Sequence, residues 1–244
     1  MKRRHLFAAN WKMHKTAAEA VQYFQEFQQL IHSKADIYIA PPFTAIYSLA
    51  QLAEKTPITI GAQNMYGEVE GAFTGEISAK MLVDAGASFV ILGHSERRRL
   101  FHEENSLINR KIHLALQNNL DVLLCIGETS EERQNGKTTQ ILEQQLTECL
   151  HGVKEISKIT IAYEPVWAIG NGHAATPSDA DEAHRFIRGW LNARWHSQEV
   201  RILYGGSVNA KNAAEFLKKE DIDGLLVGTA SLSPQSFSEI VNLG

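Results

Sequence analysis

The feature that most restricts the fold of this chain is a series of short apolar runs, each followed by a segment with helical character. Most of these runs lack the alternation of polar and apolar residues that marks a strand with one face in water. Uninterrupted apolar runs are typical of strands that are buried on both faces, as in a parallel sheet. Eight runs of strand length occur, at residues 6–9, 37–40, 58–60, 89–92, 122–126, 159–163, 200–204 and 224–227.

The intervening segments carry signals for helices. Residues 16–19 (Thr-Ala-Ala-Glu) form a capping box, and apolar residues at helical spacing follow it as far as Ile31. Residues 178–181 resemble such a helix start, directly after Pro177. Further helices are expected over residues 140–150, 211–219 and 235–241. Strands that alternate with helices predict a parallel sheet covered by helices.

The number of strand–helix units favours a closed (β/α)8 barrel over an open, doubly wound sheet. The chain has 244 residues, and barrels of this kind typically have about 250. No linker, repeat or low-complexity tract divides it. We therefore expect an α/β fold with a single domain over residues 1–244, in which outer helices surround eight parallel strands. Residues 62–78 form the longest stretch without a clear period, which is typical of a functional or interaction loop.

Composition and charge exclude several other classes of protein. A net charge of −4, with no long run of Lys or Arg, argues against nucleic acid as a partner. No apolar stretch approaches the roughly 20 residues needed to cross a bilayer. The two cysteines, Cys125 and Cys149, fit a reducing compartment, so we expect a cytoplasmic protein without a membrane partner. The histidines and cysteines show no ligand spacing, so no metal site is expected.

Polar residues and glycines follow several of the predicted strands. The carboxyl ends of barrel strands form the active-site face, so these residues are expected to meet. Taken singly, each has a simpler explanation: a solvated lysine, a structural histidine, a glutamate in a salt bridge, or glycines in a turn. Their common location favours a site. The residues are Asn10 and Lys12, His94 and Glu96, Glu164, Gly205 to Ser207, and Gly228 with Thr229.

This set of side chains suits proton abstraction next to a carbonyl group. A carboxylate can take a proton from carbon, an imidazole can donate a hydrogen bond to the carbonyl oxygen, and a lysine can stabilise the developing negative charge. Backbone N–H groups after the seventh and eighth strands suit a phosphate. Such a reaction requires no cofactor. Residues 170–175 match a loose dinucleotide-binding pattern, but Pro177 and the distance from the preceding strand contradict it.

Four ordered motifs resemble those of the triosephosphate isomerase family. The sequence reads NWKM at residues 10–13, GHSERR at 93–98, AYEPVWAIG at 162–170 and YGGS at 204–207. The resemblance covers nearly the whole chain. It implies that the protein interconverts dihydroxyacetone phosphate and D-glyceraldehyde 3-phosphate, a step of glycolysis and gluconeogenesis, without a cofactor or metal.

The resemblance also implies roles for single residues. Glu164 would be the base that moves a proton between C1 and C2, and a neutral His94 would polarise the carbonyl. Lys12 would stabilise the phosphate and the enediolate, and Asn10 would orient the substrate. Accessory roles would fall to Glu96 near Lys12, to Ser95 at the start of a short helix, and to Thr74. The phosphate would be bound by Gly170, Ser207, Gly228 and Thr229.

A mobile lid over residues 165–176 and a dimer loop over residues 62–78 are further implications of the resemblance. Thr74 in this loop would reach the site of a neighbouring copy and support Asn10 and Lys12, which predicts a homodimer. The sequence departs from the usual family pattern at Asn171, Thr229 and His14. The family usually has Thr, a second Gly and Asn there, so the departures bear on phosphate affinity rather than on reaction type.

Two other functions remain open on the residues alone. One is another phosphate-binding barrel enzyme, such as a decarboxylase, a synthase or a Schiff-base aldolase. An aldolase needs a lysine on an inner strand position, whereas the run that ends at Glu164 has no lysine after Lys158. The other is a catalytically silent binding protein with this fold. Such a protein is expected to lack Lys12, His94 or Glu164, and all three are present.

Overall fold

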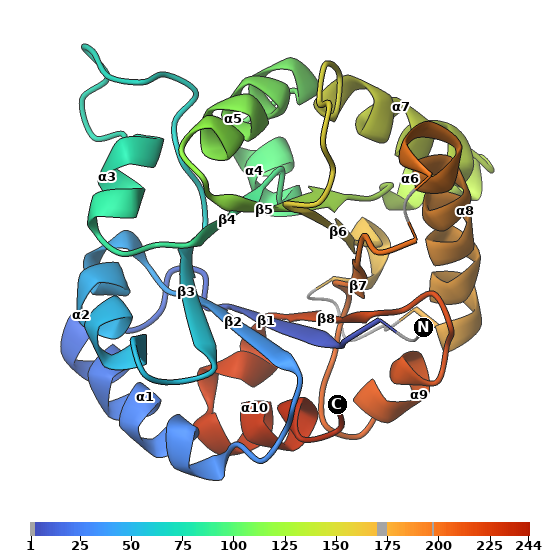
Figure 1. Cartoon of the computed structure of the whole chain (residues 1–244). Helices are drawn as coiled ribbons and strands as arrows, with labels where there is room; N and C mark the ends of the chain where they lie inside the picture. The colour runs from blue at the N-terminus through green and yellow to red at the C-terminus, as the bar shows by residue number, and fades with distance from the viewer. Residues whose placement is uncertain (1–2, 170–174, 197) are drawn as a thin grey trace.

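The apolar runs form the strands of a closed barrel. The computed structural model describes residues 3–169, 175–196 and 198–244, and all strand pairs within this part of the chain are parallel. The strands follow one another around the barrel in chain order, and β8 pairs with β1 to close it (Figure 1). The expected (β/α)8 barrel is therefore confirmed. The strands are β1 Leu6–Asn10, β2 Asp36–Ala40, β3 Ile58–Ala62, β4 Phe89–Leu92, β5 Asp121–Ile126, β6 Ile159–Tyr163, β7 Ile202–Tyr204 and β8 Gly224–Val227.

Helices form a ring outside the strands (Figure 1). They are α1 Ala17–Leu30, α2 Phe43–Ala53, α3 Ala79–Asp84, α4 Ser95–Leu100, α5 Asn105–Gln117, α6 Ser130–Gln134, α7 Thr138–Cys149, α8 Pro177–Trp195, α9 Ala213–Leu217 and α10 Pro234–Val241. Two 3-10 turns, η1 Val166–Ala168 and η2 Thr229–Leu232, follow β6 and β8. None of the described helices is long and apolar enough to cross a membrane.

The first turn of α8 differs from the sequence-based expectation. The helix begins at Pro177, and Thr176 rather than Ser178 is its N-cap. The Thr176 hydroxyl accepts a hydrogen bond from the Asp179 N–H, and the Asp179 carboxylate accepts one from the Thr176 N–H. Proline is favoured as the first helical residue because its missing N–H would have no partner there. The proline therefore lies inside the helix, and placing the helix start after it was wrong.

The apolar runs lack polar residues because both faces of the strands are buried. In β1, Leu6 and Ala8 belong to a cluster inside the barrel, whereas Phe7 and Ala9 belong to the larger core between strands and helices. Tyr38 packs against the inner cluster and stacks on Phe89, with a ring-centroid distance of 4.4 Å. The inner cluster consists of Leu6, Ala8, Ala40, Phe89, Ile91, Leu123, Cys125, Ala162, Leu203 and Leu226.

The same alternation carries polar residues to one end of the barrel interior. Successive side chains of a strand point to opposite faces, so residues two apart share a face. Asn10 is two residues beyond Ala8, and Glu164 is two residues beyond Ala162. Asn10 ends β1, and Glu164 directly follows β6, so both lie at the carboxyl ends of their strands. The strand pattern thus puts polar side chains where the interior opens.

A long loop lies between β3 and α3. Residues 63–78 contain no helix or strand, and residues 68–76 are all exposed. The base of the loop is closed by a hydrogen bond from the Tyr66 N–H to the Ile77 carbonyl oxygen at 2.8 Å. In Figure 1 the loop (teal) projects from the barrel beside α3. It coincides with the stretch in which the sequence shows no period.

Candidate active site

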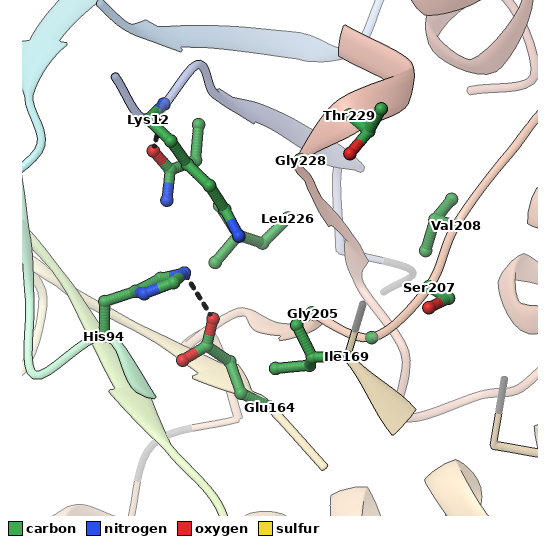
Figure 2. Close-up of a pocket in the computed structure, with 12 residues that line it drawn as sticks. Lys12, His94, Glu164, Ile169, Gly205, Ser207, Val208, Leu226, Gly228 and Thr229 are labelled. Atoms are coloured by element: carbon green, nitrogen blue, oxygen red, sulfur yellow. Dashed lines mark hydrogen bonds and ion pairs between the residues drawn. The ribbon is translucent and has the colours of Figure 1, made fainter. Parts of the chain in front are cut away.

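A pocket opens at the carboxyl ends of the strands (Figure 2). Its cavity of about 170 Å³ is smaller than the roughly 300–1,000 Å³ of sites for drug-sized ligands. It therefore suits a small metabolite rather than a dinucleotide. Figure 2 shows the Lys12, His94 and Glu164 side chains turned toward a common space. The lining residues are Asn10, Lys12, His94, Glu164, Ile169, Gly205, Gly206, Ser207, Val208, Leu226, Gly228 and Thr229.

Glu164 is buried and held by two donors. Only 2% of the residue is exposed. Its Oε1 lies 3.0 Å from Nε2 of His94, and its Oε2 accepts a hydrogen bond from the Ser95 N–H at 2.9 Å. Burial raises the pKa of Glu164, but His94, the Ser95 N–H and Lys12 lower it by more, so the net shift is downward. The site therefore holds an ionised carboxylate.

His94 is the N-cap of α4, and the start of this helix orients its ring. Nδ1 accepts a hydrogen bond from the Glu96 N–H at 3.2 Å. Burial lowers the pKa of His94, but the Glu164 and Glu96 carboxylates together raise it by more, so the net shift is upward. Only an unprotonated Nδ1 can accept a hydrogen bond, so this contact opposes a second proton on the ring. A neutral imidazole with its proton on Nε2 satisfies both the Glu96 and the Glu164 contacts.

Lys12 reaches the pocket from a strained turn after β1. Its φ of 52° lies in the left-handed region, which costs a non-glycine residue about 1–2 kcal/mol. The turn is fixed by two hydrogen bonds: the Lys12 N–H donates to Oδ1 of Asn10 at 3.1 Å, and the Gln63 amide donates to the Lys12 carbonyl at 2.8 Å. The Lys12 ammonium forms an ion pair of 2.5 Å with Oε1 of Glu96. Strain of this kind is typical of functional sites.

The opposite wall of the pocket consists of backbone-rich loops. Thr229 begins η2, and its φ lies outside the left-handed region. N–H groups in the first turn of a helix lack intrahelical partners, so they are free to bind an anion. A Cβ atom added to Gly228 would lie 3.7 Å from Cε of Lys12, so this loop runs beside the lysine. Ser207 differs, because its hydroxyl and its N–H both donate to the Ala168 carbonyl, at 2.8 and 3.2 Å.

A family model described as triosephosphate isomerase matches residues 5–244. The chain belongs to the triosephosphate isomerase family. The triosephosphate isomerase of Dictyoglomus turgidum is 50% identical to this chain, and the alignment covers 98% of the chain and 99% of the relative. That of Aquifex aeolicus is also 50% identical and covers 98% of each. That of Protochlamydia amoebophila is 49% identical and covers 98% of the chain and 93% of the relative. The chain is therefore an isomerase.

Most of the residues chosen for their resemblance to triosephosphate isomerase line the pocket or touch residues that do. Ser95 and Glu96 are not in the lining, but they bind Glu164 and Lys12 respectively. Thr74 is exposed in the loop over residues 63–78, outside the lining. The residues that line the pocket as expected are Asn10, Lys12, His94, Glu164, Ser207, Gly228 and Thr229.

One expected phosphate ligand cannot be placed. Gly170 lies outside the described residues, as do residues 171–174 of the predicted lid over residues 165–176. Of that segment, Pro165 to Ile169 and Ala175 to Thr176 are described. Among these, Ala168 contacts Ser207 and Ile169 lines the pocket.

Sequence reasoning assigned no role to several residues that line the pocket. Gly205 and Gly206 belong to a strand end that the sequence singled out, and a Cβ atom on Gly205 would lie 3.0 Å from Cγ of Glu164. Leu226 could have been found from the alternation of β8. Ile169 and Val208 carry no signal that separates them from ordinary apolar loop residues.

Glu128 was also missed, although it supports the segment that follows Glu164. Its fully buried carboxylate accepts hydrogen bonds from the Tyr163 hydroxyl at 3.0 Å and from Nε1 of Trp167 at 2.9 Å. A carboxylate two residues beyond β5 is itself a polar residue at a strand end, so the rule that selected the other site residues would have selected Glu128.

Proposed function

We propose that this chain interconverts dihydroxyacetone phosphate and D-glyceraldehyde 3-phosphate by proton transfer through an enediolate, in glycolysis and gluconeogenesis. The observation that carries the proposal is the contact between the Glu164 carboxylate and Nε2 of His94, 3.0 Å apart in a small buried pocket that also holds the Lys12 ammonium. Membership of the triosephosphate isomerase family agrees with this reaction.

Glu164 would act as the base. Its carboxylate takes a proton from C1 of the ketose, the C–H electron pair moves into the C1–C2 bond, and the C2 carbonyl becomes the enediolate oxygen. Returning the proton to C2, with a proton exchanged between the two oxygens, gives the aldose. No electrons leave the substrate, so the reaction needs no cofactor. A buried carboxylate close to the reacting carbon suits this task because it is fixed in position.

His94 would donate a hydrogen bond to the substrate oxygen. In a neutral ring, Nε2 carries one proton, so it cannot donate to Glu164 and to a carbonyl oxygen at once. A bound substrate therefore takes the place of Glu164 at His94, and the freed carboxylate faces the substrate carbon. Because contact with His94 lowers the pKa of Glu164, losing this contact makes the carboxylate a stronger base.

Lys12 and the two glycine-containing loops would bind the phosphate and stabilise the enediolate. The lysine contributes a positive charge, and the N–H groups of Gly170, Gly228 and Thr229 contribute donors. The Ser207 N–H would join them once it releases the Ala168 carbonyl. Residues 165–176 would close over the substrate and exclude water. The hydrogen bonds from Ser207 to the Ala168 carbonyl support this, because they join the phosphate loop to the start of the proposed lid. Asn10 would orient the substrate.

A cytoplasmic homodimer is the form that we propose for the active protein. Large exposed apolar residues occur between residues 13 and 101 and, apart from Leu243, nowhere else in the described chain. A concentration of exposed apolar side chains is typical of an interaction surface. It includes Val69 and Phe73 of the long loop, so a second copy would cover this loop and bring Thr74 toward the neighbouring Asn10 and Lys12.

A coupled isomerase assay on the wild type and on Glu164→Asp tests the proposed reaction. Shortening the side chain by one methylene withdraws the base from the reacting carbon, so kcat should fall by about 100-fold or more while KM changes little. Glu239→Asp, at an exposed position of α10, is the matched control and should behave as wild type. Full activity in Glu164→Asp would exclude Glu164 as the base, and an inactive wild type would contradict the proposed reaction.

A further inference from the structure

Arg98 has no part in the proposed reaction, yet its side chain is directed at the backbone of the active site. It lies on α4, four residues after His94, and is half-buried. Its guanidinium contacts two backbone carbonyls, an amide oxygen and a thiol. No carboxylate in the described part of the chain forms an ion pair with it. An arginine whose partners are all neutral acts through the geometry of its donors rather than through charge neutralisation.

Two hydrogen bonds from Arg98 bracket His94. The Arg98 N–H donates to the His94 carbonyl at 3.1 Å, and Nε of Arg98 donates to the Gly93 carbonyl at 2.7 Å. Gly93 has a φ of 72°, and a Cβ atom there would lie 2.9 Å from Nη2 of Arg98. The missing side chain of Gly93 thus leaves room for the guanidinium. The first bond is a backbone bond of α4, whereas the second comes from the side chain, so the guanidinium fixes the peptide group that precedes the imidazole.

The guanidinium also reaches the strand beside the one that leads to Glu164. Nη2 of Arg98 donates to the Cys125 carbonyl at 3.2 Å. Cys125 pairs in register with Ala162 of β6, and the next carbonyl along β5, that of Ile126, accepts a hydrogen bond from the Glu164 N–H at 2.7 Å. Arg98 therefore holds the end of β4, before His94, against β5, which binds the backbone of Glu164.

The far side of the guanidinium is anchored to two outer helices. Nη1 donates to Oδ1 of Asn105 at 2.5 Å, and Nη2 lies 3.6 Å from Sγ of Cys149. Asn105 is held in turn by Glu148, whose carboxylate accepts from its amide at 2.8 Å. Lysine has a single ammonium group and cannot reach these directions together, whereas the planar fork of arginine can.

We propose that Arg98 is a positioning residue for the reaction, which sets the distance between the His94 imidazole and the Glu164 carboxylate. The inference rests on the proposed function of these two residues. Arg98 does not touch the substrate, so its loss should weaken only interactions that depend on the placement of His94 and Glu164. A misplacement of about 1 Å at a reacting group lowers the rate by about 100-fold.

The test compares Arg98→Lys and Arg98→Gln with Arg99→Lys and Arg99→Gln, which alter an exposed neighbour on the same helix. We expect kcat to fall by about 10-fold in Arg98→Lys and about 100-fold in Arg98→Gln, with KM within about threefold of wild type. The Arg99 variants should retain full activity. Thermal unfolding and circular dichroism show whether each variant is folded at the assay temperature.

Binding of two ligands distinguishes a role of Arg98 in placing His94 and Glu164 from a general loss of order in the pocket. A phosphorylated hydroxamate that mimics the enediolate would need the hydrogen bond that we propose for His94, whereas glycerol 3-phosphate carries the phosphate but no carbonyl. In the Arg98 variants, affinity for the hydroxamate should fall in proportion to kcat, and affinity for glycerol 3-phosphate should stay close to that of the wild type. Equal losses for both ligands, or an unchanged kcat in folded Arg98→Lys, would overturn the proposal.

Asn105→Ala provides a second route to the same question. It leaves Arg98 in place but removes the anchor of the guanidinium, so a smaller loss of kcat at constant KM is expected. If Arg98→Gln fails to fold, Arg98→Lys and Asn105→Ala replace it, and wild-type kcat in folded Arg98→Lys still overturns the inference. An active wild type and active Arg99 variants uphold the proposed function in either case, so the two failures are distinguishable.

Discussion

The Cys125 thiol shows how single residues preserve the charge state of the site. Burial and the nearby Glu164 carboxylate raise the pKa of Cys125 well above its ordinary value, although Arg98 opposes this. The group therefore remains a neutral thiol beside the base. A thiolate there would place a second negative charge next to Glu164 and would disfavour the ionised carboxylate that the proposed reaction requires.

Thr229 offers a test of phosphate binding at the scale of one residue. Because Thr229 begins η2 without left-handed strain, glycine is not needed at this position. Thr229→Gly adds backbone freedom that costs about 0.5–1 kcal/mol, so KM should rise severalfold while kcat changes less. Steady-state kinetics measure both, and Thr229→Ser serves as the control. A collapse of kcat at unchanged KM would show that Thr229 does not act through phosphate affinity.

Sequence reasoning located most of the site residues to which the strand-end rule applies, and Glu128 is the exception. Asn10 and Glu164 share a face with Ala8 and Ala162, so their place could be derived from the strand pattern alone. Arg98 could not be found this way, because it acts through a short helix and through carbonyl groups that no side-chain pattern reveals. The carbonyl groups that accept its hydrogen bonds come together only in the fold, where the ends of β4 and β5 lie side by side.

At the scale of elements, the strands could be predicted better than the helices. Burial on both faces gives most strands a clear apolar run, but α4 and α6 have fewer than two turns and show no period. Helix α5 was missed for another reason. Lys111 interrupts its buried stripe, yet the ammonium is itself buried and forms an ion pair with Glu103 at 2.6 Å and a hydrogen bond to Asn64 at 2.9 Å. A charged residue on the buried face of a helix interrupts the apolar pattern by which the helix could be recognised in the sequence.

Helix α8 carries a buried histidine that should make the fold sensitive to acid. The ring of His184 packs edge-on against Tyr163, and its Nδ1 lies 3.0 Å from the Asp221 carbonyl. Its Nε2 is buried and has no hydrogen-bond partner among the described residues. Burial lowers the pKa of His184 to about 4. The ring is therefore neutral in the folded protein at neutral pH. It stays largely unprotonated until the pH approaches about 4.

The sign of the pH effect follows from the difference in proton uptake. In the unfolded chain the histidine binds a proton near pH 6.5, which the folded chain does not do until about pH 4. The free energy of unfolding should therefore fall as the pH drops through this window, by at most about 3 kcal/mol from this group. Urea unfolding at pH 8 and pH 5 measures the effect.

His184→Gln should show a smaller loss of unfolding free energy between pH 8 and pH 5 than the wild type does, because the group that titrates has been removed. His32→Gln, at an exposed position after α1, is the control and should keep the wild-type difference. An identical pH dependence in His184→Gln and in the wild type would show that His184 does not contribute to acid sensitivity.

At the scale of the whole molecule, the large exposed apolar residues of the described chain, apart from Leu243, lie between residues 13 and 101, as does the long loop. Thr74→Arg places a long charged side chain on the proposed interface, so we expect this variant to be monomeric at micromolar concentration. It should also have a lower kcat, because the neighbouring Lys12 and Asn10 lose their support. Light scattering coupled to gel filtration, with an activity assay on the same fractions, measures both.

Glu182→Arg is the control for this experiment. It introduces the same charge at an exposed position of α8, across the barrel from α2 and α3 (Figure 1), and should remain dimeric and active. A Thr74→Arg monomer with wild-type activity would refute the role proposed for Thr74, and a monomeric wild type would refute the dimer.

The closure of the barrel joins the first strand to the last. Leu6 of β1 pairs with Gly224 of β8, and the pocket takes Asn10 and Lys12 from one end of the chain and Gly228 and Thr229 from the other. During synthesis on the ribosome, one edge of β1 therefore has no strand partner until more than 200 further residues have been added. The binding site therefore cannot be complete before Gly228 and Thr229 have been synthesised.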